Sequence, residues 1–256
     1  MAKTVLIIHA HPEPTSLTRQ LVDTTKAALI SAGHSVLDSD LYGMQWKAVF
    51  DAADFPVRVN PSRLSFIDES GHAFATGTQT EDVELEQRKL QQADAVIFLF
   101  PLWWFGLPAI LKGWIDRVFA YGLAYGYKGA GNRYRYGEGG FAGKRALLVV
   151  TVGAPASDYG ERGINGPLEQ LLFPVTHGTL FFAGMDVLPT LAVYNAASAD
   201  RSQVAAAKEM LEREVVRLFE TEPIPYRRQN DGDYPNGREL SPNVAPGKFG
   251  IEAHIR

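Results

Sequence analysis

The chain has 256 residues, 46% of them hydrophobic, carries a formal net charge of −4 and contains no cysteine. Without cysteine it has no disulfides, no thiolate nucleophile and no cysteine-ligated metal cluster, so redox chemistry would need a bound cofactor. Because the chain has no block of basic residues, nucleic acid and anionic membrane surfaces are excluded as expected partners and a small ligand is favoured.

The first element is expected at residues 5–8, where an apolar run ends in a polar loop. The run is too short to cross a bilayer or to act as a signal peptide, so we expect a strand, no integral membrane segment and a cytoplasmic protein. The loop matches neither a P-loop nor the dinucleotide-binding glycine pattern. Its hydroxyl residues Thr15, Ser16 and Thr18 lie at the start of a helix that ends at Gly33. Such a start can hold a phosphate, or Thr15 or Ser16 can simply cap it.

Residues 35–41 have the pattern of a second strand, and residues 81–92 that of a charged helix. Between them, residues 42–80 show no regular periodicity. A segment of this length is too long for a simple connection, so we expect an excursion that packs on a partner or covers a site.

The apolar residues 95–100, which end at Pro101, are typical of a strand buried on both faces of a parallel sheet. A helix is predicted to start near residue 108. Between the two, residues 103–105 are consecutive large aromatics. They cannot all face one core, so at least one ring should be exposed. It could stack on a flat cofactor, or it could belong to a hydrophobic cluster or a dimer contact.

Residues 121–143 are rich in glycine and tyrosine and predict a mobile, aromatic-lined loop. Residues 146–150 predict a fourth strand. The loop of small residues that follows would let the backbone approach a ligand closely. Tyr159 and Asn165 offer polar groups to the same place.

The last elements predicted are a helix over residues 167–182, a fifth strand over 187–194 and an amphipathic helix over 200–220. The remaining segment is rich in proline, glycine, asparagine and arginine. It predicts an extended C-terminal arm over residues 223–256 beside one domain over residues 1–222.

Strands that alternate with helices predict an α/β fold. We expect a flavodoxin-like, doubly wound, five-stranded parallel sheet with helices on both faces. Three of its strands, which end near Ile8, Phe100 and Val150, carry loops suited to a ligand. Open sheets of this kind bind ligands at the carboxyl ends of their strands.

Five segments carry a family resemblance. They are H-P-E-P-T-S-L-T at 11–18, S-D-L-Y at 39–42, E-Q-R-K-L at 86–90, F-P-L-W-W-F-G-L-P-A-I-L-K-G-W at 100–114 and T-V-G-A-P-A-S-D-Y-G-E-R-G-I-N-G at 151–166. In these segments the chain resembles the NAD(P)H:quinone oxidoreductase family of the DT-diaphorase type. The resemblance implies FAD, with FMN as the alternative, and a homodimer with sites at the subunit interface. It also implies two-electron reduction of a quinone by NAD(P)H in a ping-pong reaction.

The resemblance also implies roles for individual residues. Those it places around the ribityl and phosphate region of the flavin are His11, Thr15, Ser16, Leu17 and Thr18. Those it places around the isoalloxazine are Pro101, Leu102, Trp103, Trp104 and Phe105, with Thr151, Gly153 and Ala154 at the polar edge and Arg201 at a phosphate of FAD. Tyr159 matches the catalytic tyrosine, and Tyr125 and Tyr127 would line the substrate site from the opposite subunit. Asn165 stands where the family has the histidine of G-I-H-G, as in the relative that prefers dihydronicotinamide riboside.

Three other interpretations are open. His9 and His11 lie two residues apart, but without cysteine or an H-E-x-x-H motif we expect no metal site. Similar flavoproteins are ancillary subunits of potassium efflux systems, in which case residues 42–80 or the tail would contact the transporter. An electron-carrier flavodoxin would be shorter and would lack the three consecutive aromatics.

Overall fold

The sheet at the centre of the molecule is parallel. The structure, a computed structural model, describes residues 1–126 and 134–256. The strands in this part of the chain are β1 (Thr4–His9), β2 (Ser35–Asp40), β3 (Ala95–Pro101), β4 (Arg145–Thr151), β5 (Asp186–Val187) and β6 (Leu191–Val193). Their order is β2-β1-β3-β4-β5, and β6 also pairs with β4. The predicted flavodoxin-like α/β sheet is therefore confirmed.

The fifth position of the sheet differs from the single strand predicted over residues 187–194. β5 pairs with Arg145 and Ala146 at the start of β4, whereas β6 pairs with residues 149–151 at its end. Pro189 lies between the two pieces and has no N–H to donate to a ladder. The strand is therefore interrupted there and forms two short pieces along one edge.

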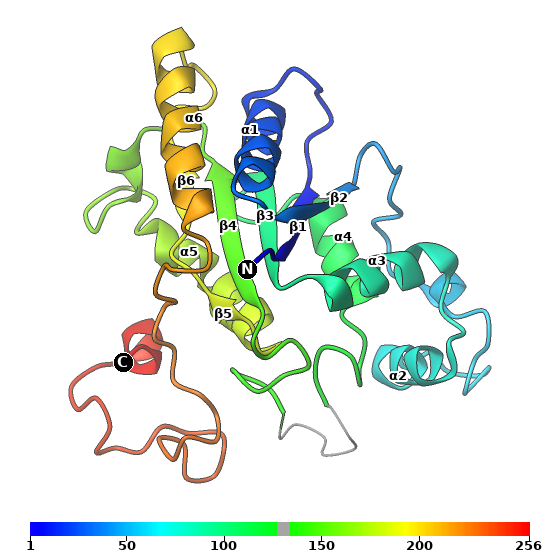
Figure 1. Ribbon diagram of the computed structural model, residues 1–256. Coiled ribbons are helices and arrows are strands. Elements are labelled where there is room, and N and C mark those ends of the chain that lie inside the picture. Colours follow the sequence, from blue (N-terminus) through cyan, green and yellow to red (C-terminus); the bar gives the residue numbers. More distant parts are fainter. Residues whose placement is uncertain (127–133) are drawn as a thin grey trace.

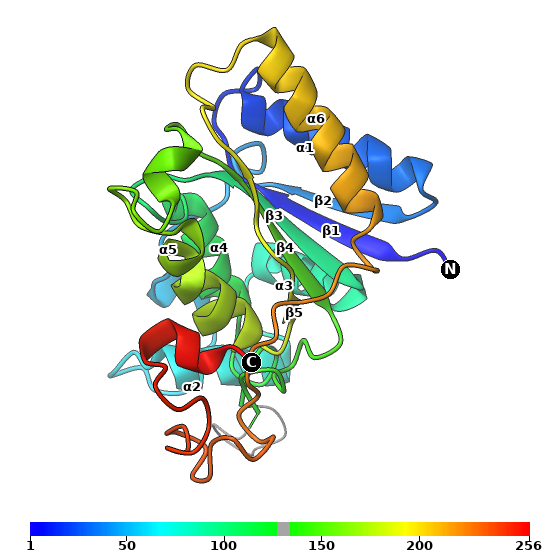
Figure 2. The ribbon, with the colours of Figure 1, turned by 90° about the vertical axis from the view of Figure 1, so that its left-hand side faces the viewer.

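Helices cover both faces of the sheet, as Figures 1 and 2 show. α1 (Leu17–Ser31) and α6 (Arg201–Val216) pack against each other on one face. On the other face lie α3 (Glu81–Gln92), α4 (Ala109–Val118) and α5 (Leu168–Val175), and a π-helix over Thr176–Phe181 continues α5. These helices were all predicted, with ends that differ by a few residues.

Two apolar clusters join the layers. Because successive side chains of a strand alternate between faces, Leu6 and Phe98 belong to the cluster under α4, and Ile7 and Ile97 to the cluster under α1. Every residue of β3 is buried, in agreement with its continuous apolar sequence. This rigid frame fixes where the loops at the strand ends lie.

The excursion over residues 42–80 contains a helix that the periodicity did not predict, α2 (Phe66–Thr76). One of the two residues that α2 buries is Glu69. Its carboxylate accepts hydrogen bonds from Arg58 Nε at 2.9 Å and from the Val59 N–H at 2.8 Å. Because a carboxylate in a sequence usually indicates a surface position, the pattern did not identify the buried face of this helix.

A buried ion pair fastens the excursion to α4. Arg117 Nε lies 2.7 Å from Asp54 Oδ1, and both side chains are almost inaccessible to solvent. Gly113 permits the close approach, because a Cβ there would lie 2.0 Å from the carbonyl oxygen of Ala48. Whether the excursion also packs on a partner or covers a site stays a prediction.

The C-terminal tail over residues 223–256 runs along the α5 side of the molecule (Figure 2). Tyr226 forms an antiparallel bridge with Ile255, so the tail folds back on itself. A short 3-10 helix, Gly250–His254, lies near its end. The division into a domain over residues 1–222 and an arm stays a prediction.

Candidate active site

Three strand ends enclose one cavity of about 410 Å³. β1, β3 and β4 are parallel neighbours, so their carboxyl ends lie at the same edge of the sheet (Figure 1). The residues that line the cavity are His11, Ser16, Leu17, Thr18, Pro101, Leu102, Trp103, Thr151, Gly153, Ala196 and Ala197. All of them except Ala196 and Ala197 were predicted from the sequence to hold the flavin.

The start of α1 presents hydrogen-bond donors to this cavity. Ser16 caps the helix, since its Oγ accepts a hydrogen bond from the Arg19 N–H at 3.1 Å. The N–H groups of Leu17 and Thr18 belong to the first turn and have no acceptor within the helix. The capping interpretation is therefore confirmed for Ser16, and donors suited to an anion remain beside it.

His11 and Thr15 are both tied to Glu13. His11 Nδ1 accepts a hydrogen bond from the Glu13 N–H at 3.0 Å, which leaves the proton of a neutral ring on Nε2. Burial lowers the pKa of His11 more than its contacts with Glu13 raise it. The hydroxyl of Thr15 donates to the Glu13 carboxylate at 2.7 Å, and Thr15 does not line the cavity. His11 is thus neutral at pH 7 and offers a donor, whereas the Thr15 hydroxyl is already bonded.

A buried contact between hydroxyl groups joins two of the strand ends. Thr18 Oγ1 lies 2.8 Å from Thr151 Oγ1, and both side chains are buried. The carbonyl of Thr151 accepts a hydrogen bond from the Leu102 N–H at 2.9 Å. Three segments far apart in the sequence are therefore fixed relative to one another at the cavity floor.

The aromatic loop forms a tight turn with an unusual backbone. Trp104 and Phe105 have φ angles of 49° and 60°, and the Gly106 N–H donates to the Trp103 carbonyl at 3.1 Å. Two left-handed residues in the middle of a turn normally call for asparagine or glycine, so large rings here carry backbone strain. The exposed fractions are 40% for Trp103, 96% for Trp104 and 47% for Phe105. The expectation of an exposed ring beside the site is confirmed.

The loop after β4 meets the segment that follows β6. The Ala154 carbonyl accepts a hydrogen bond from the Asn195 N–H at 3.0 Å, and the Ala196 N–H donates to Val152 at 2.9 Å. This pairing carries Ala196 and Ala197 into the cavity. Small residues after a strand were the signal that identified residues 153–156, and the same signal at 196–197 could have identified the missing wall.

Tyr159 and Asn165 lie outside the cavity lining, in the loop after β4. The Tyr159 ring lies 5.8 Å from that of Tyr194. The Asn165 N–H donates to the Asp158 carbonyl at 2.9 Å, which closes the loop next to Tyr159. Across residues 1–126 and 134–256, no hydrogen bond joins the side chains of Tyr159 and Asn165. Their catalytic roles stay predictions.

Three further residues were predicted to belong to the site: Arg201, Tyr125 and Tyr127. Arg201 is the exposed first residue of α6, on the same edge of the sheet as the cavity but not part of its lining. Tyr125 lies beyond the far end of α4, a helix of about 15 Å by its length, and its ring packs 5.4 Å from Phe182. Tyr127 lies outside the described residues. One chain alone therefore does not bring Tyr125 to the aromatic turn.

The cavity suits a flavin better than a metal ion. In the described ranges, no three histidine or carboxylate side chains are grouped to hold a metal, and no helix is long and apolar enough to cross a membrane. The cavity offers N–H donors, hydroxyls and the partly exposed ring of Trp103 in one place, whereas the predicted Trp104, Phe105 and Ala154 are not part of its lining. A Cβ at Gly153 would meet Ala197 at 3.7 Å, so this wall is built from small groups. Such a donor set fits a phosphorylated, flat cofactor.

Comparison with known proteins identifies the family. A family model described as a flavodoxin-like fold matches residues 3–215. A ribosyldihydronicotinamide dehydrogenase-like protein of Penicillium crustosum is 47% identical over 90% of this chain and 86% of its own length. The human ribosyldihydronicotinamide dehydrogenase [quinone] is 37% identical over 87% of this chain and 95% of its own length.

Solved structures agree. A Klebsiella pneumoniae protein provisionally named a quinone reductase superposes with a TM-score of 0.95 at 48% identity and covers 100% of both chains. A quinone oxidoreductase from Methanothermobacter marburgensis, at 24% identity and a TM-score of 0.65 over 86% of this chain and 98% of its own, shows the shared fold. The chain therefore belongs to the flavodoxin-like family and, within it, to the NAD(P)H:quinone oxidoreductases.

Proposed function

We propose that this protein is a flavin-dependent oxidoreductase that takes a hydride from a reduced nicotinamide and passes two electrons to a quinone. The observation that carries the proposal is the cavity at three strand ends, in which helix N–H groups, hydroxyls and the Trp103 ring converge, with the exposed rings of Trp104 and Phe105 in the same turn. The names of the relatives supply the substrate class. FAD is the proposed cofactor, with FMN as the alternative.

The residues of the cavity divide into two groups by chemistry. The N–H groups of Leu17 and Thr18 would hold a phosphate at the helix start, where the helix dipole favours an anion. Trp103, Trp104 and Phe105 would lie against the flat ring system. When bound, the flavin would accept the hydride and return it, chemistry that no side chain of this chain can supply.

Tyr159 and Asn165 are proposed to face the reacting ring from the loop after β4. A tyrosine hydroxyl can donate a hydrogen bond where negative charge develops. An amide at position 165 can orient that hydroxyl but cannot gain a proton, unlike a histidine. The ribosyldihydronicotinamide names of the relatives make a small nicotinamide donor a candidate beside NAD(P)H.

The proposed active unit is a homodimer. Tyr125 lies at the opposite end of α4 from the aromatic turn, so it can reach a flavin only in a second copy of the chain. Reduced nicotinamide and quinone would then use one slot in turn, which gives ping-pong kinetics. Parallel lines in double-reciprocal plots at several quinone concentrations and a dimer by sedimentation are the expected results.

The decisive experiment is the identification of the cofactor. The protein is purified from cells supplied with flavin, denatured, and the released chromophore is weighed by mass spectrometry. FAD or FMN at about one per chain supports the proposal, and absence of any flavin together with no flavin binding on titration contradicts it.

A variant tests the aromatic turn. Trp104→Ala should weaken flavin binding about fivefold to tenfold, because a stacked ring is worth about 1 kcal/mol beyond its buried area. Phe249→Ala, which removes another exposed ring from the tail, is the matched control and should bind flavin normally. Equal flavin affinity in both variants would assign Trp104 to another role.

The relatives reported above carry enzyme names, so the interpretation as an ancillary subunit of a potassium efflux system finds no support in them. An electron-carrier flavodoxin is not favoured either, because the exposed aromatic turn is a feature suited to a stacked substrate.

A further inference from the structure

A second cavity, of about 490 Å³, lies between the tail and the end of α5. The tail joins the sheet where the Ile224 N–H donates to the Val187 carbonyl at 2.8 Å, and β5 pairs with the start of β4. This cavity, here called the tail pocket, is therefore at the amino ends of the strands, away from the flavin cavity. Its size is typical of a site for a small organic molecule.

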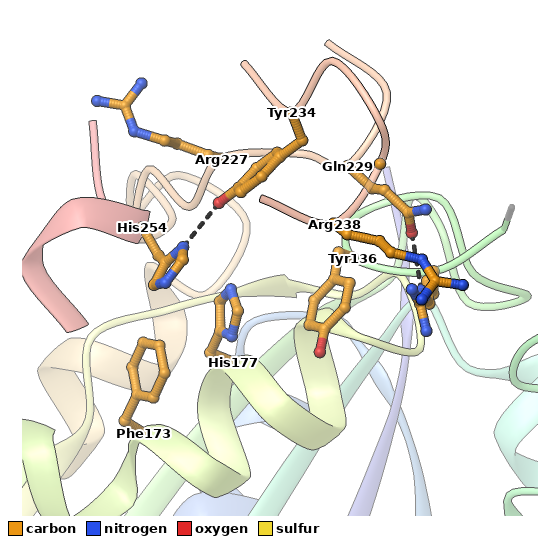
Figure 3. A pocket seen from close by; sticks show the side chains of 10 residues that line it. Tyr136, Phe173, His177, Arg227, Gln229, Tyr234, Arg238 and His254 are labelled. Atoms are coloured by element: carbon orange, nitrogen blue, oxygen red, sulfur yellow. Dashed lines mark hydrogen bonds between the residues drawn. The ribbon is translucent and has the colours of Figure 1, made fainter. Parts of the chain in front are cut away.

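One wall of the tail pocket is a stack of rings. The His177 ring lies 4.5 Å from that of Phe173 at an interplanar angle of 10°, and 5.0 Å from that of Tyr136 at 29°. Figure 3 shows the His177 ring between Phe173 and Tyr136, pointing toward the tail. Burial first, and His254 second, lower the pKa of His177 to about 4, so its ring is neutral at pH 7. Because both faces of the His177 ring are covered, this wall presents the edges of uncharged aromatic rings.

The tail supplies the opposite wall. The Tyr234 hydroxyl and His254 Nδ1 are hydrogen-bonded at 2.8 Å, which fixes both rings (Figure 3). The His254 and His177 rings lie 5.7 Å apart. The space is thus bordered by aromatic groups from two distant parts of the chain, and a planar molecule can lie against the ring edges of the first wall.

The charge of the lining is entirely positive. Among the described residues, Arg135, Arg227 and Arg238 line the tail pocket, and no aspartate or glutamate does. Arg227 is paired with Asp233 at 2.8 Å, and Arg135 Nε donates to the side chain of Gln229 at 3.0 Å. In the part of the chain that the structure describes, the guanidinium of Arg238 has neither an ion pair nor a hydrogen bond. It is a free, planar donor for a carboxylate.

We propose that the tail pocket binds a flat aromatic carboxylate, with its ring against His177 and its carboxylate at Arg238 and Arg135. The ring stack excludes a purely inorganic anion as the best ligand, because phosphate would leave the aromatic surface uncovered. The arginines favour an anion over a neutral aromatic molecule. The tail pocket is separate from the flavin cavity of the same chain, and the proposal rests on the lining of the pocket, not on the proposed enzymatic function.

The probe is 2-naphthoate, titrated calorimetrically into the full chain at 150 mM salt. We expect it to bind about tenfold more tightly than the neutral isostere 2-naphthylmethanol, since only the anion can pair with arginine. Arg238→Gln should remove most of that difference. Arg88→Gln, an exposed arginine on α3, is the matched control and should leave the affinity unchanged.

A second variant separates contact with the His177 ring from charge. His177→Ala should weaken naphthoate and naphthylmethanol alike, whereas Arg238→Gln should weaken only naphthoate. Far-ultraviolet circular dichroism and an unchanged unfolding midpoint show that each variant is folded. The proposal is overturned if naphthoate does not bind, if Arg238→Gln binds it normally, or if Trp104→Ala rather than Arg238→Gln abolishes binding.

Discussion

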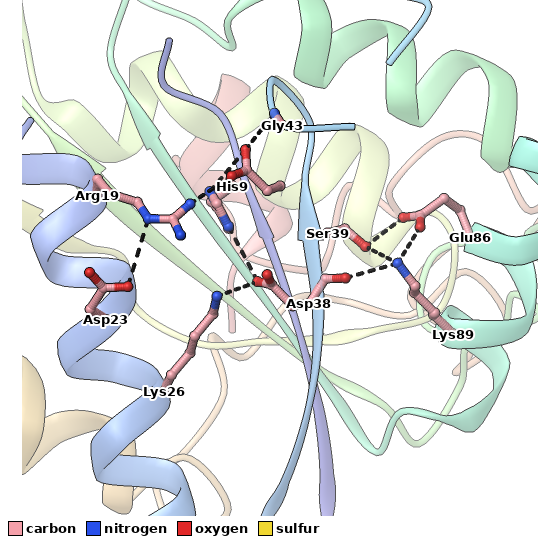
Figure 4. Close-up of polar contacts among 10 residues, drawn as sticks. His9, Arg19, Asp23, Lys26, Asp38, Ser39, Gly43, Glu86 and Lys89 are labelled. Atoms are coloured by element: carbon pink, nitrogen blue, oxygen red, sulfur yellow. Dashed lines mark hydrogen bonds and ion pairs between the residues drawn. The ribbon is translucent and has the colours of Figure 1, made fainter. Parts of the chain in front are cut away.

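The two edges of the sheet are closed by different chemistry. At the β2 edge, shown in Figure 4, charged groups dominate. Asp38 lies 3.2 Å from His9 Nε2 and 2.8 Å from Lys26 Nζ, and Asp40 lies 2.6 Å from Arg19 Nη1. The excursion that follows β2 continues this pattern with its buried ion pair to Arg117.

At the β5 edge, aromatic rings take the place of charges. Tyr226 is buried, and its hydroxyl is 2.9 Å from Thr176 Oγ1. Its ring contacts those of Phe173, His177 and Phe181 at centroid distances of 5.0–6.1 Å. β2 has six residues, four of them polar, whereas β5 has only two residues. The short edge is therefore covered by a folded tail.

This difference predicts how substitutions at each edge change the stability of the protein. A buried charge depends on one specific partner, and loss of that partner leaves the other charge unpaired. In a cluster of rings, each substitution removes only part of the contacts, and loss of a tyrosine hydroxyl leaves the ring contacts in place. The two edges should therefore differ in their response to single substitutions and in the pH range where they weaken.

The largest effect is expected for Arg117→Ala at the β2 side. Buried Asp54 would keep the partly exposed Lys47, 3.1 Å away, but would lose its buried partner, and Asp82 would lose its contact with Arg117. The free energy of unfolding should therefore fall by about 3–4 kcal/mol. Lys112→Ala, which removes a surface ion pair with Asp116 in the same helix, is the matched control and should cost about 0–1 kcal/mol. Urea unfolding measures both. A cost below about 1 kcal/mol for Arg117→Ala would show that this ion pair does not hold the excursion.

The same contrast explains what could be predicted from the sequence. β3 and β4 have continuous apolar runs, and α4 has apolar spacing, so periodicity identified them. α2 was not predicted, because one of its two buried residues is Glu69 and a charged residue in a sequence usually indicates a surface position. Buried polar pairs are set by partners distant in the sequence, which no local pattern records.

The candidate site divides in the same way. Loops at the ends of parallel strands must meet at one edge, so most of the cavity lining could be predicted from chain order and the resemblance. The left-handed backbone of Trp104 and Phe105 could not, because those residue types rarely adopt it. The tail pocket was missed since it depends on rings from α5 and the tail that meet only in three dimensions.

A second prediction tests whether rings hold the β5 edge. Tyr226→Ala should lower the free energy of unfolding by about 3 kcal/mol, because it removes a buried ring. Tyr226→Phe keeps the ring and loses only the hydrogen bond to Thr176, so it should cost about 1 kcal/mol. Thermal unfolding at matched protein concentration compares them. Equal costs for the two substitutions would assign the stabilisation to the hydroxyl and remove the contrast between the edges.

A third prediction concerns mild acid and the β5 edge. The pKa of His177 is lowered to about 4 by burial and by His254. Between about pH 6.5 and 4, His177 is therefore protonated in the unfolded chain but neutral in the folded chain. Burial also lowers the pKa of His254. Stability should therefore decline as pH falls from about 6.5 to 4, by about 3 kcal/mol from His177.

The matched variant is His177→Phe, which keeps a flat ring and cannot titrate. Its unfolding free energy at pH 7.5 should resemble that of the wild type, and its decline between pH 6.5 and 4 should be smaller. A decline as steep as that of the wild type would place the responsible proton on another group.

The smallest effect is expected at the β2 edge in stronger acid. Burial alone would raise the pKa of Asp38, but the neighbouring His9 and Lys26 outweigh it and lower the pKa to about 2. A lowered carboxyl pKa stabilises the folded chain above the unfolded pKa of about 3.8, and this stability is lost as pH falls from about 4 to 2. Because the Asp38 side chain is 41% exposed, solvent screening reduces the contribution to about 1 kcal/mol. Asp38→Asn should therefore be less stable than the wild type at pH 6 and equal to it near pH 2, measured by urea unfolding. A constant difference at both pH values would mean that the Asp38 charge does not stabilise this edge and that the substitution acts through packing.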